Sequence, residues 1–200
     1  MFSSQTMKRG HLSELLRSSK TVFSFKDLVL LWGIDKFKAV SMANYYIKKG
    51  ELYHIRRGLY AKDRNYDKFE LATRIFTPSY ISFETVLIKE GLNFQFYERI
   101  FVATYQTKEI ICDGQTYSFK TIKPTILINN KGIENKENYS IASPERAFLD
   151  VLYLNKDYHF DNLSVLNWEK VFEILPIYGG NKRMDKKVKE FFEYDKHNNS

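Results

Sequence analysis

The sequence predicts an α+β protein in two parts: an N-terminal winged helix-turn-helix, residues 1–62, and an α+β domain, residues 63–200, with a small, mostly antiparallel sheet and C-terminal helices. Three observations lead to this prediction. Residues 1–62 contain twelve Lys and Arg against four Asp and Glu. The apolar residues change from helical to alternating spacing after Gly50. The composition, 44% hydrophobic and 16% aromatic, is sufficient for a buried core.

The first two helices are predicted from their apolar spacing and their caps. Residues 11–20 are expected to form a short helix, followed by an extended segment at 21–24. Ser24 and Asp27 have the spacing of a capping box, and Gly33 is a stop signal for the helix between them.

The third helix and the hairpin complete the first part. Asp35 is placed to cap a helix that runs to Lys49. Two β-prone runs, 52–55 and 59–61, flank a turn that contains Gly58, as in a β-hairpin. Helix, helix, turn, helix and basic hairpin is the order of a winged helix-turn-helix.

The third helix divides into two faces at about 100° per residue. The face expected to pack on the domain contains Phe37, Val40, Ala43, Asn44 and Ile47. The opposite face, expected to enter the major groove of DNA, contains Lys38, Ser41, Met42, Tyr45 and Lys49, with Tyr46 at its edge. An ordinary amphipathic surface helix is the alternative interpretation.

Arg56 and Arg57 stand at the tip of the predicted hairpin. Two arginines at a tip suit contact with phosphates or the minor groove. Residues 63–200 carry nineteen basic and twenty acidic side chains, so the whole charge excess lies in the first part. This asymmetry indicates a polyanion-binding module on a neutral body, and a solvated basic face without a partner is the alternative.

The second part reads as alternating helices and strands. Helices are expected at 69–76, at 83–90 with Ser82 as its cap, from Ser143 to Tyr153, and near 168–175 and 184–194. Strands are expected at 99–105, 109–112, 115–122, 125–128 and 139–142, with a tight turn at Asp113-Gly114 and a loop over 129–138.

The sequence offers few residues that are candidates for catalysis or for metal binding. The four histidines are dispersed, so we expect no metal site and no cofactor. Cys112, in an apolar run, is expected to be a buried, inert thiol. Arg146 and Asp150 have the spacing of a helix-surface ion pair. The basic group at 182–189 is interspersed with acids and is expected to be a solvated helix face. We therefore expect no catalytic activity.

The location follows from what the sequence lacks. The first twenty residues are mostly polar, without the apolar stretch of a signal peptide. No run of about 18 uncharged apolar residues occurs, so no membrane partner is expected. These observations predict a cytoplasmic protein.

Segments from both parts point to one family: Val22–Leu28, Lys48–Tyr53, Arg56–Ala61, Pro78–Glu84 and Ser143–Asp150. Together they resemble the AbiEi-type antitoxins and transcriptional regulators of bacterial abortive-infection (type IV) toxin–antitoxin systems, over about residues 21–155. The resemblance implies a winged helix that represses its own operon by binding inverted repeats in promoter DNA. It also implies a second domain that counters a nucleotidyltransferase-like toxin, and no enzymatic activity.

Two other functions remain as alternatives. The N-terminal fold can be a protein-interaction module without DNA binding, which predicts no salt-dependent affinity for DNA. An RNA- or nucleotide-processing enzyme would need a convergent cluster of carboxylates or histidines, which the sequence does not offer. With Met42, Tyr45 and Tyr46 on the exposed face, base contacts would be more apolar than an Arg-to-guanine contact.

Overall fold

The computed structural model describes residues 3–198, and it is mixed α+β, as the sequence predicts. The chain separates into two compact units, unit 1 (Met1–Ile75) and unit 2 (Phe76–Ser200). Each unit contains its own β-sheet together with helices. The two units are therefore described separately.

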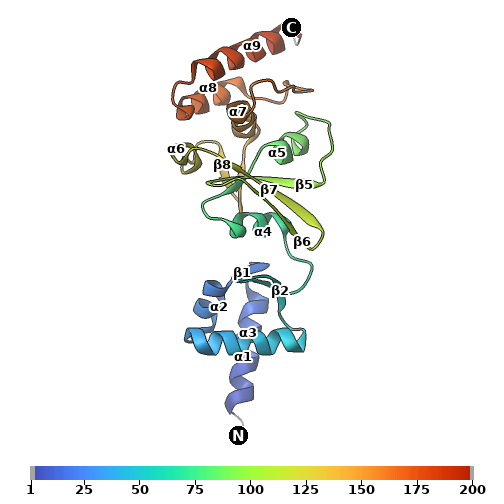
Figure 1. Ribbon diagram of the computed structural model, residues 1–200, viewed down its shortest axis with the longest axis vertical. Coiled ribbons are helices and arrows are strands. Elements are labelled where there is room, and N and C mark those ends of the chain that lie inside the picture. Colours follow the sequence, from blue (N-terminus) through green and yellow to red (C-terminus); the bar gives the residue numbers. More distant parts are fainter. Residues whose placement is uncertain (1–2, 199–200) are drawn as a thin grey trace. The chain divides into compact units, whose positions relative to one another are not determined.

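Unit 1 combines helices with a three-stranded antiparallel sheet (Figure 1). The strand order is β1-β3-β2, so β3, the last of these three strands along the chain, is the central one. Its elements are α1 (Ser3–Arg17), β1 (Val22–Ser24), α2 (Phe25–Trp32), α3 (Lys36–Lys49), β2 (Tyr53–Arg56), β3 (Leu59–Ala61) and α4 (Lys68–Ile75).

The predicted helix caps of unit 1 are confirmed. Ser24 Oγ accepts a hydrogen bond from the Asp27 N–H, and the Asp27 carboxylate accepts one from the Ser24 N–H, which completes the capping box. Helix α2 ends at Gly33, whose φ of 61° lies in the left-handed region that favours glycine. Asp35 caps α3 by accepting from the Lys38 N–H.

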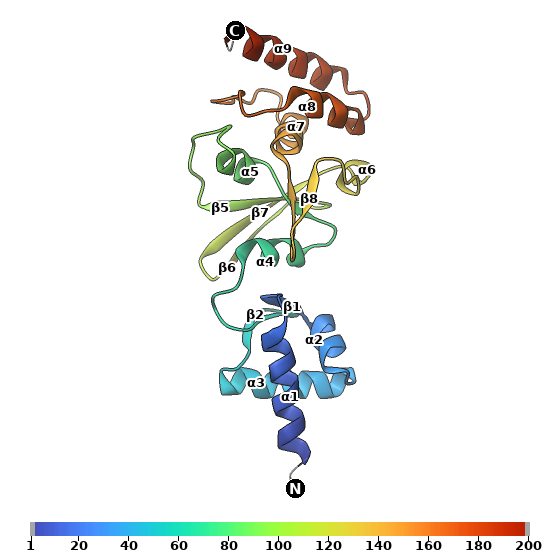
Figure 2. The same cartoon turned by 180° about the vertical axis from the view of Figure 1, so that it is seen from behind.

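The core of unit 1 lies between α1, α2 and α3. Leu15, Leu28 and Trp32 are buried there with residues of α3. Helix α3 lies in front of α1 in Figure 1 and behind it in Figure 2, and both views show the two helices crossing steeply. One side of α3 thus packs on the unit, and the other side is left for solvent.

Unit 1 ends after α4, whereas the sequence placed the boundary after Lys62. The reason is Glu70, which is fully buried and binds the loop before β1. Its carboxylate accepts from the Thr21 N–H at 2.8 Å and from the Thr21 hydroxyl at 2.7 Å. Arg74 forms an ion pair with Glu70 at 3.0 Å and a second ion pair with Asp27 at 3.1 Å. These polar contacts hold α4 in unit 1. A count of charged residues along the sequence does not reveal them.

Unit 2 is built on a six-stranded sheet in the order β6-β7-β5-β4-β9-β8. The sheet is mixed: β6-β7, β5-β4 and β9-β8 are antiparallel, and β7-β5 and β4-β9 are parallel. The strands are β4 (Tyr80–Ile81), β5 (Arg99–Thr104), β6 (Lys108–Cys112), β7 (Gln115–Thr121), β8 (Ile133–Asn135) and β9 (Ser140–Ala142).

The helices of unit 2 gather on one face of the sheet. Helices α5 and α7 lie over the sheet, and α8 and α9 lie beyond α7 (Figures 1 and 2). The bounds are α5 (Glu84–Lys89), α6 (Pro124–Leu127), α7 (Pro144–Leu154), α8 (Trp168–Ile174), the 3-10 turn η1 (Leu175–Tyr178) and α9 (Lys182–Asn198).

Three local predictions for unit 2 are wrong. Residues 125–128 lie mostly in the short helix α6 rather than in a strand, because Pro124 occupies its first turn with the φ that a helix requires. The expected loop 129–138 contains β8. Ser82 does not cap α5: Phe83 is the N-cap residue, without a side-chain cap, and the Ser82 hydroxyl donates to Asp150 instead.

Candidate nucleic-acid interface

Helix α3 is held to unit 1 by a narrow stripe of side chains. Ala39, Ala43 and Tyr46 are buried, at i, i+4 and i+7 spacing. The two alanines permit close helix packing, and the Tyr46 ring lies 5.8 Å from the Trp32 ring, centroid to centroid. Met42 and Ile47 pack at the edges of the same cluster.

The predicted orientation of α3 is therefore wrong by about a quarter turn. Phe37 is 88% exposed and Val40 is 48% exposed, although both were expected to face the core. Met42, expected in the groove-facing set, packs against the core. The prediction of the buried face used apolar character alone. In the structure, two alanines and one tyrosine pack on the core in place of Phe37 and Val40.

The exposed face of α3 comprises eight residues between Phe37 and Lys49. Its members are Phe37, Lys38, Val40, Ser41, Asn44, Tyr45, Lys48 and Lys49. Lys38, Ser41, Tyr45 and Lys49 thus lie where the sequence predicted, and Asn44 and Lys48 are exposed residues that the predicted groove-facing set omitted. The periodicity of alanines in α3, rather than of large apolar residues, is the signal that would have found them.

The polar groups of this face are only partly occupied. Lys38 Nζ lies 3.2 Å from the Asp35 carboxylate, and the Ser41 hydroxyl donates to the Phe37 carbonyl. Lys49 Nζ lies 5.8 Å from the centroid of the Tyr45 ring. The side chains of Asn44 and Lys48 make no hydrogen bond or ion pair with any residue that the structure describes. Both are available to a ligand.

Positive charge stands at both ends of α3. Lys36 and Lys38 begin the helix, and Lys48 and Lys49 end it. At 1.5 Å per residue, the helix spans about 20 Å. The major groove of B-DNA is about 12 Å wide, so the two ends of a helix lying in it approach phosphates on its opposite sides.

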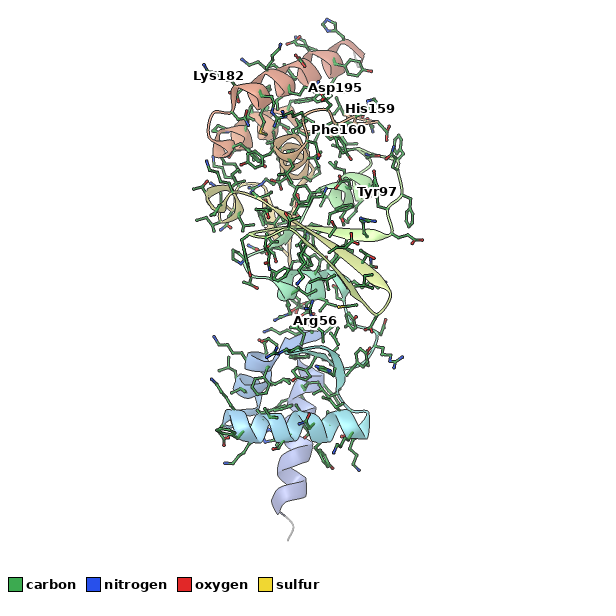
Figure 3. The ribbon with its side chains drawn as sticks, in the orientation of Figure 1. Arg56, Tyr97, His159, Phe160, Lys182 and Asp195 are labelled. Carbon is green, nitrogen blue, oxygen red and sulfur yellow. The ribbon has the colours of Figure 1, made fainter. Side chains whose placement is uncertain are left out.

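The hairpin holds its two arginines differently. Arg57 is exposed at the turn, as predicted. Arg56, on β2 (Figure 3), is half-buried, and its Nη1 is buried without a hydrogen-bond partner among the described residues. The Gly58 carbonyl accepts from the Phe25 N–H at 2.9 Å, which fixes the turn against the start of α2. Arg57 is thus free to contact a ligand, and Arg56 is partly withdrawn.

Unit 2 contains a buried charged network centred on Arg146 and Asp150. The predicted pair of Arg146 and Asp150 forms, but both residues are 0% exposed, so the pair lies in the interior and not on the helix surface as expected. Arg146 Nε donates to Asp150 at 3.3 Å, and its Nη2 donates to the Tyr80 hydroxyl at 2.8 Å. The Ser82 and Tyr178 hydroxyls donate to Asp150 at 2.8 and 2.7 Å.

The remaining donors of Arg146 bind the backbone after β7. Nη1 donates to the Asn129 and Lys131 carbonyls, and Nη2 to the Ile126 carbonyl at the end of α6. All five N–H groups of the guanidinium are thereby used. The network joins segments 78–84 and 143–150, which were singled out in the sequence as a family resemblance.

The protonation states in this network suit a structural role. Burial raises the pKa values of Tyr80 and Tyr178 well above that of an ordinary tyrosine, so both hydroxyls remain protonated donors at neutral pH. Burial also raises the pKa of Asp150, which the Arg146 charge and three hydroxyls oppose. Every polar group is occupied within the protein, so the cluster has no free acid, base or nucleophile to offer a substrate.

Three basic residues of α9 have partners within unit 2. Arg183 donates to the Leu152 and Tyr153 carbonyls at the end of α7. Lys186 and Lys187 lie 3.9 and 3.5 Å from Glu190. A groove of about 680 Å³ lies beside α9, where His159 and Phe160 face the helix that carries Asp195 (Figure 3). Its acidic lining does not suit a polyanion.

Metal chemistry and membrane insertion find no support in the described residues. Residues 3–198 contain no group of three His, Cys, Asp or Glu side chains that could hold a metal ion. Over the same range, no helix is long and apolar enough to cross a membrane. Cys112 is buried and is not part of a disulfide.

Two comparisons with known proteins found no match. No model of a protein family matches the chain, and no curated protein matches it.

Proposed function

We propose that unit 1 is a winged helix-turn-helix that binds double-stranded promoter DNA, with α3 as its recognition helix and the β2–β3 hairpin as its wing. The element order supports this assignment: two helices joined by a short turn, followed by a hairpin whose second strand pairs with β1. The excess of eight positive charges in residues 1–62 supports a polyanionic partner.

The observation that carries the proposal is the exposed face of α3. Its small alanines pack on the core, whereas the opposite face is exposed, with lysines at both ends and with the Asn44 and Lys48 side chains unbonded among the described residues. Phe37, a large apolar side chain, is 88% exposed on this face beside Val40. Duplex DNA offers phosphates for the lysines and base edges for the residues between them.

In the cell, we propose that the protein is a cytoplasmic, non-enzymatic antitoxin that represses its own operon at inverted repeats. We further propose that unit 2 counters a nucleotidyltransferase-like toxin. These assignments rest on the resemblance to AbiEi-type antitoxins, and two of the segments that carry it, 78–84 and 143–150, meet in the buried Arg146–Asp150 network of unit 2.

A salt titration of DNA binding tests the proposal. If about four phosphates are neutralised, the logarithm of affinity should fall with the logarithm of salt at a slope of about −3.6. Arg57→Ala should reduce the slope by about 1, and Arg56→Ala should have a smaller effect because Arg56 is half-buried. Fluorescence anisotropy with a duplex from the promoter of the protein's own gene measures both. Absence of any salt-dependent affinity would overturn DNA binding.

One observation favours a protein-interaction module as the second candidate. Phe37 and Val40 form an exposed apolar surface of the kind that contacts protein partners. This function predicts that α3 variants weaken a protein complex and that the chain shows no affinity for duplex DNA. The same titration therefore separates the two candidates.

A further inference from the structure

The centre of the exposed face of α3 carries chemistry suited to one class of base pair. Phe37, Ser41, Asn44 and Lys48 recur at i, i+4, i+7 and i+11 and form a single stripe, with Val40 beside it. We propose that this stripe reads A·T base pairs in the major groove, with Phe37 and Val40 on thymine methyl groups and Asn44 on adenine. The inference rests on the proposed DNA-binding function and extends it to sequence preference.

The apolar part of the stripe indicates thymine. A large apolar side chain kept in water loses the free energy that burial would provide, and Phe37 is 88% exposed. The 5-methyl group of thymine is the apolar group that base pairs present in the major groove, and Phe is among the side chains that contact it. Val40, one turn along the same side, extends this apolar contact.

The amide of Asn44 indicates adenine. Asn pairs in bidentate fashion with N6 and N7 of adenine, and the Asn44 amide has no partner among the described residues. Arginine, the common reader of guanine, is absent from α3, whose four cations are lysines at the helix ends. The lysines therefore suit phosphates, and the reading residues lie between them.

The spacing of Phe37 and Asn44 along α3 determines how many base pairs the stripe can contact. Phe37 and Asn44 are seven residues apart, which corresponds to about 10 Å along the helix. Base pairs are stacked about 3.4 Å apart, so the stripe covers about three base-pair steps. Each bound copy should thus prefer a short A·T-rich element.

Modified DNA tests this inference atom by atom. The promoter duplex is prepared with deoxyuridine in place of thymidine, which removes only the 5-methyl groups, or with 7-deazaadenine, which removes only N7 of adenine. The full-length chain should bind the deoxyuridine duplex about tenfold more weakly, a difference of about 1.4 kcal/mol. Phe37→Ala with Val40→Ala should bind the thymidine and deoxyuridine duplexes equally.

Asn44→Ala should likewise lose sensitivity to 7-deazaadenine and keep its sensitivity to deoxyuridine. Leu16→Ala, an exposed apolar residue on α1, is the matched control and should discriminate like the wild type. Equal wild-type binding to all duplexes would overturn the A·T reading and leave DNA binding intact. No binding to any duplex would overturn the proposed function as well.

Discussion

The exposed face of α3 and the Arg146–Asp150 network both contain charged and polar side chains, yet they differ in whether those groups have partners. In the network, one guanidinium and one carboxylate are completely buried and completely hydrogen-bonded. On α3, the Asn44 amide and the Lys48 amine are exposed and have no partner in the part of the chain that the structure describes. The residues of the network, which resemble a family motif, therefore have an architectural role. The exposed face of α3 has no such motif, yet it keeps polar groups that a ligand can bind.

Removing one member of the network should have the largest effect on stability. Asp150→Asn leaves the Arg146 charge buried without a counter-charge, which should cost about 3–5 kcal/mol in the free energy of unfolding of unit 2. Each unit contains one tryptophan, Trp32 or Trp168. Denaturant titration followed by ¹⁹F NMR of 5-fluorotryptophan therefore reports on each unit separately.

The matched control for the network is Asp157→Asn, an exposed acid of unit 2. It should leave the transition of Trp168 unchanged. If Asp150→Asn and Asp157→Asn unfold at the same denaturant concentration, the network does not stabilise unit 2.

Substitutions on the buried and exposed sides of α3 should differ nearly as much in their effect on the stability of unit 1. Tyr46→Ala removes a buried ring that packs on Trp32 and should cost unit 1 about 3 kcal/mol. Phe37→Ala removes an exposed ring and should change stability by less than about 0.5 kcal/mol. Denaturation followed at Trp32 measures both. Equal losses would contradict the orientation of α3.

The smallest effect concerns the capping box and its pH dependence. Although burial favours the neutral acid, hydrogen bonds from Ser24 and Lys20 and the charge of Arg74 hold the pKa of Asp27 below its usual value of 3.8. This stabilisation is therefore present above pH 3.8 and is lost as the pH falls through the lowered pKa.

Asp27→Asn should consequently destabilise unit 1 by about 1 kcal/mol at neutral pH. The difference from the wild type should shrink in acid. Thermal unfolding of the two proteins between pH 7 and pH 2 measures it, and a difference that stays constant over this range would contradict the role of the charged carboxylate.

Local backbone signals in the sequence predicted most of unit 1. Capping by Ser24 and Asp35 and the stop at Gly33 act within four residues, so the sequence alone is sufficient to locate α2 and α3. The rotation of α3 depends on how closely its alanines approach α1 and α2, and no periodicity of large apolar residues contains that information.

Unit 2 was harder to predict because its decisive contacts are distant in sequence. Ser82 was expected to cap α5 but binds Asp150, 68 residues away. Carbonyl groups of the short helix α6 and of the loop after it accept hydrogen bonds from Arg146. The β-prone residues of this segment do not indicate such contacts. Burial of a charged residue follows from tertiary partners, so the network was mistaken for a surface contact.

A pair of identical charge reversals tests the central claim that the exposed face of α3 binds DNA. Lys48→Glu changes this face, and Lys189→Glu changes an equally exposed lysine on α9. Anisotropy titration of a promoter duplex with the full-length variants should show at least a tenfold loss of affinity for Lys48→Glu and little change for Lys189→Glu. Equal affinity of both variants and the wild type would contradict the account.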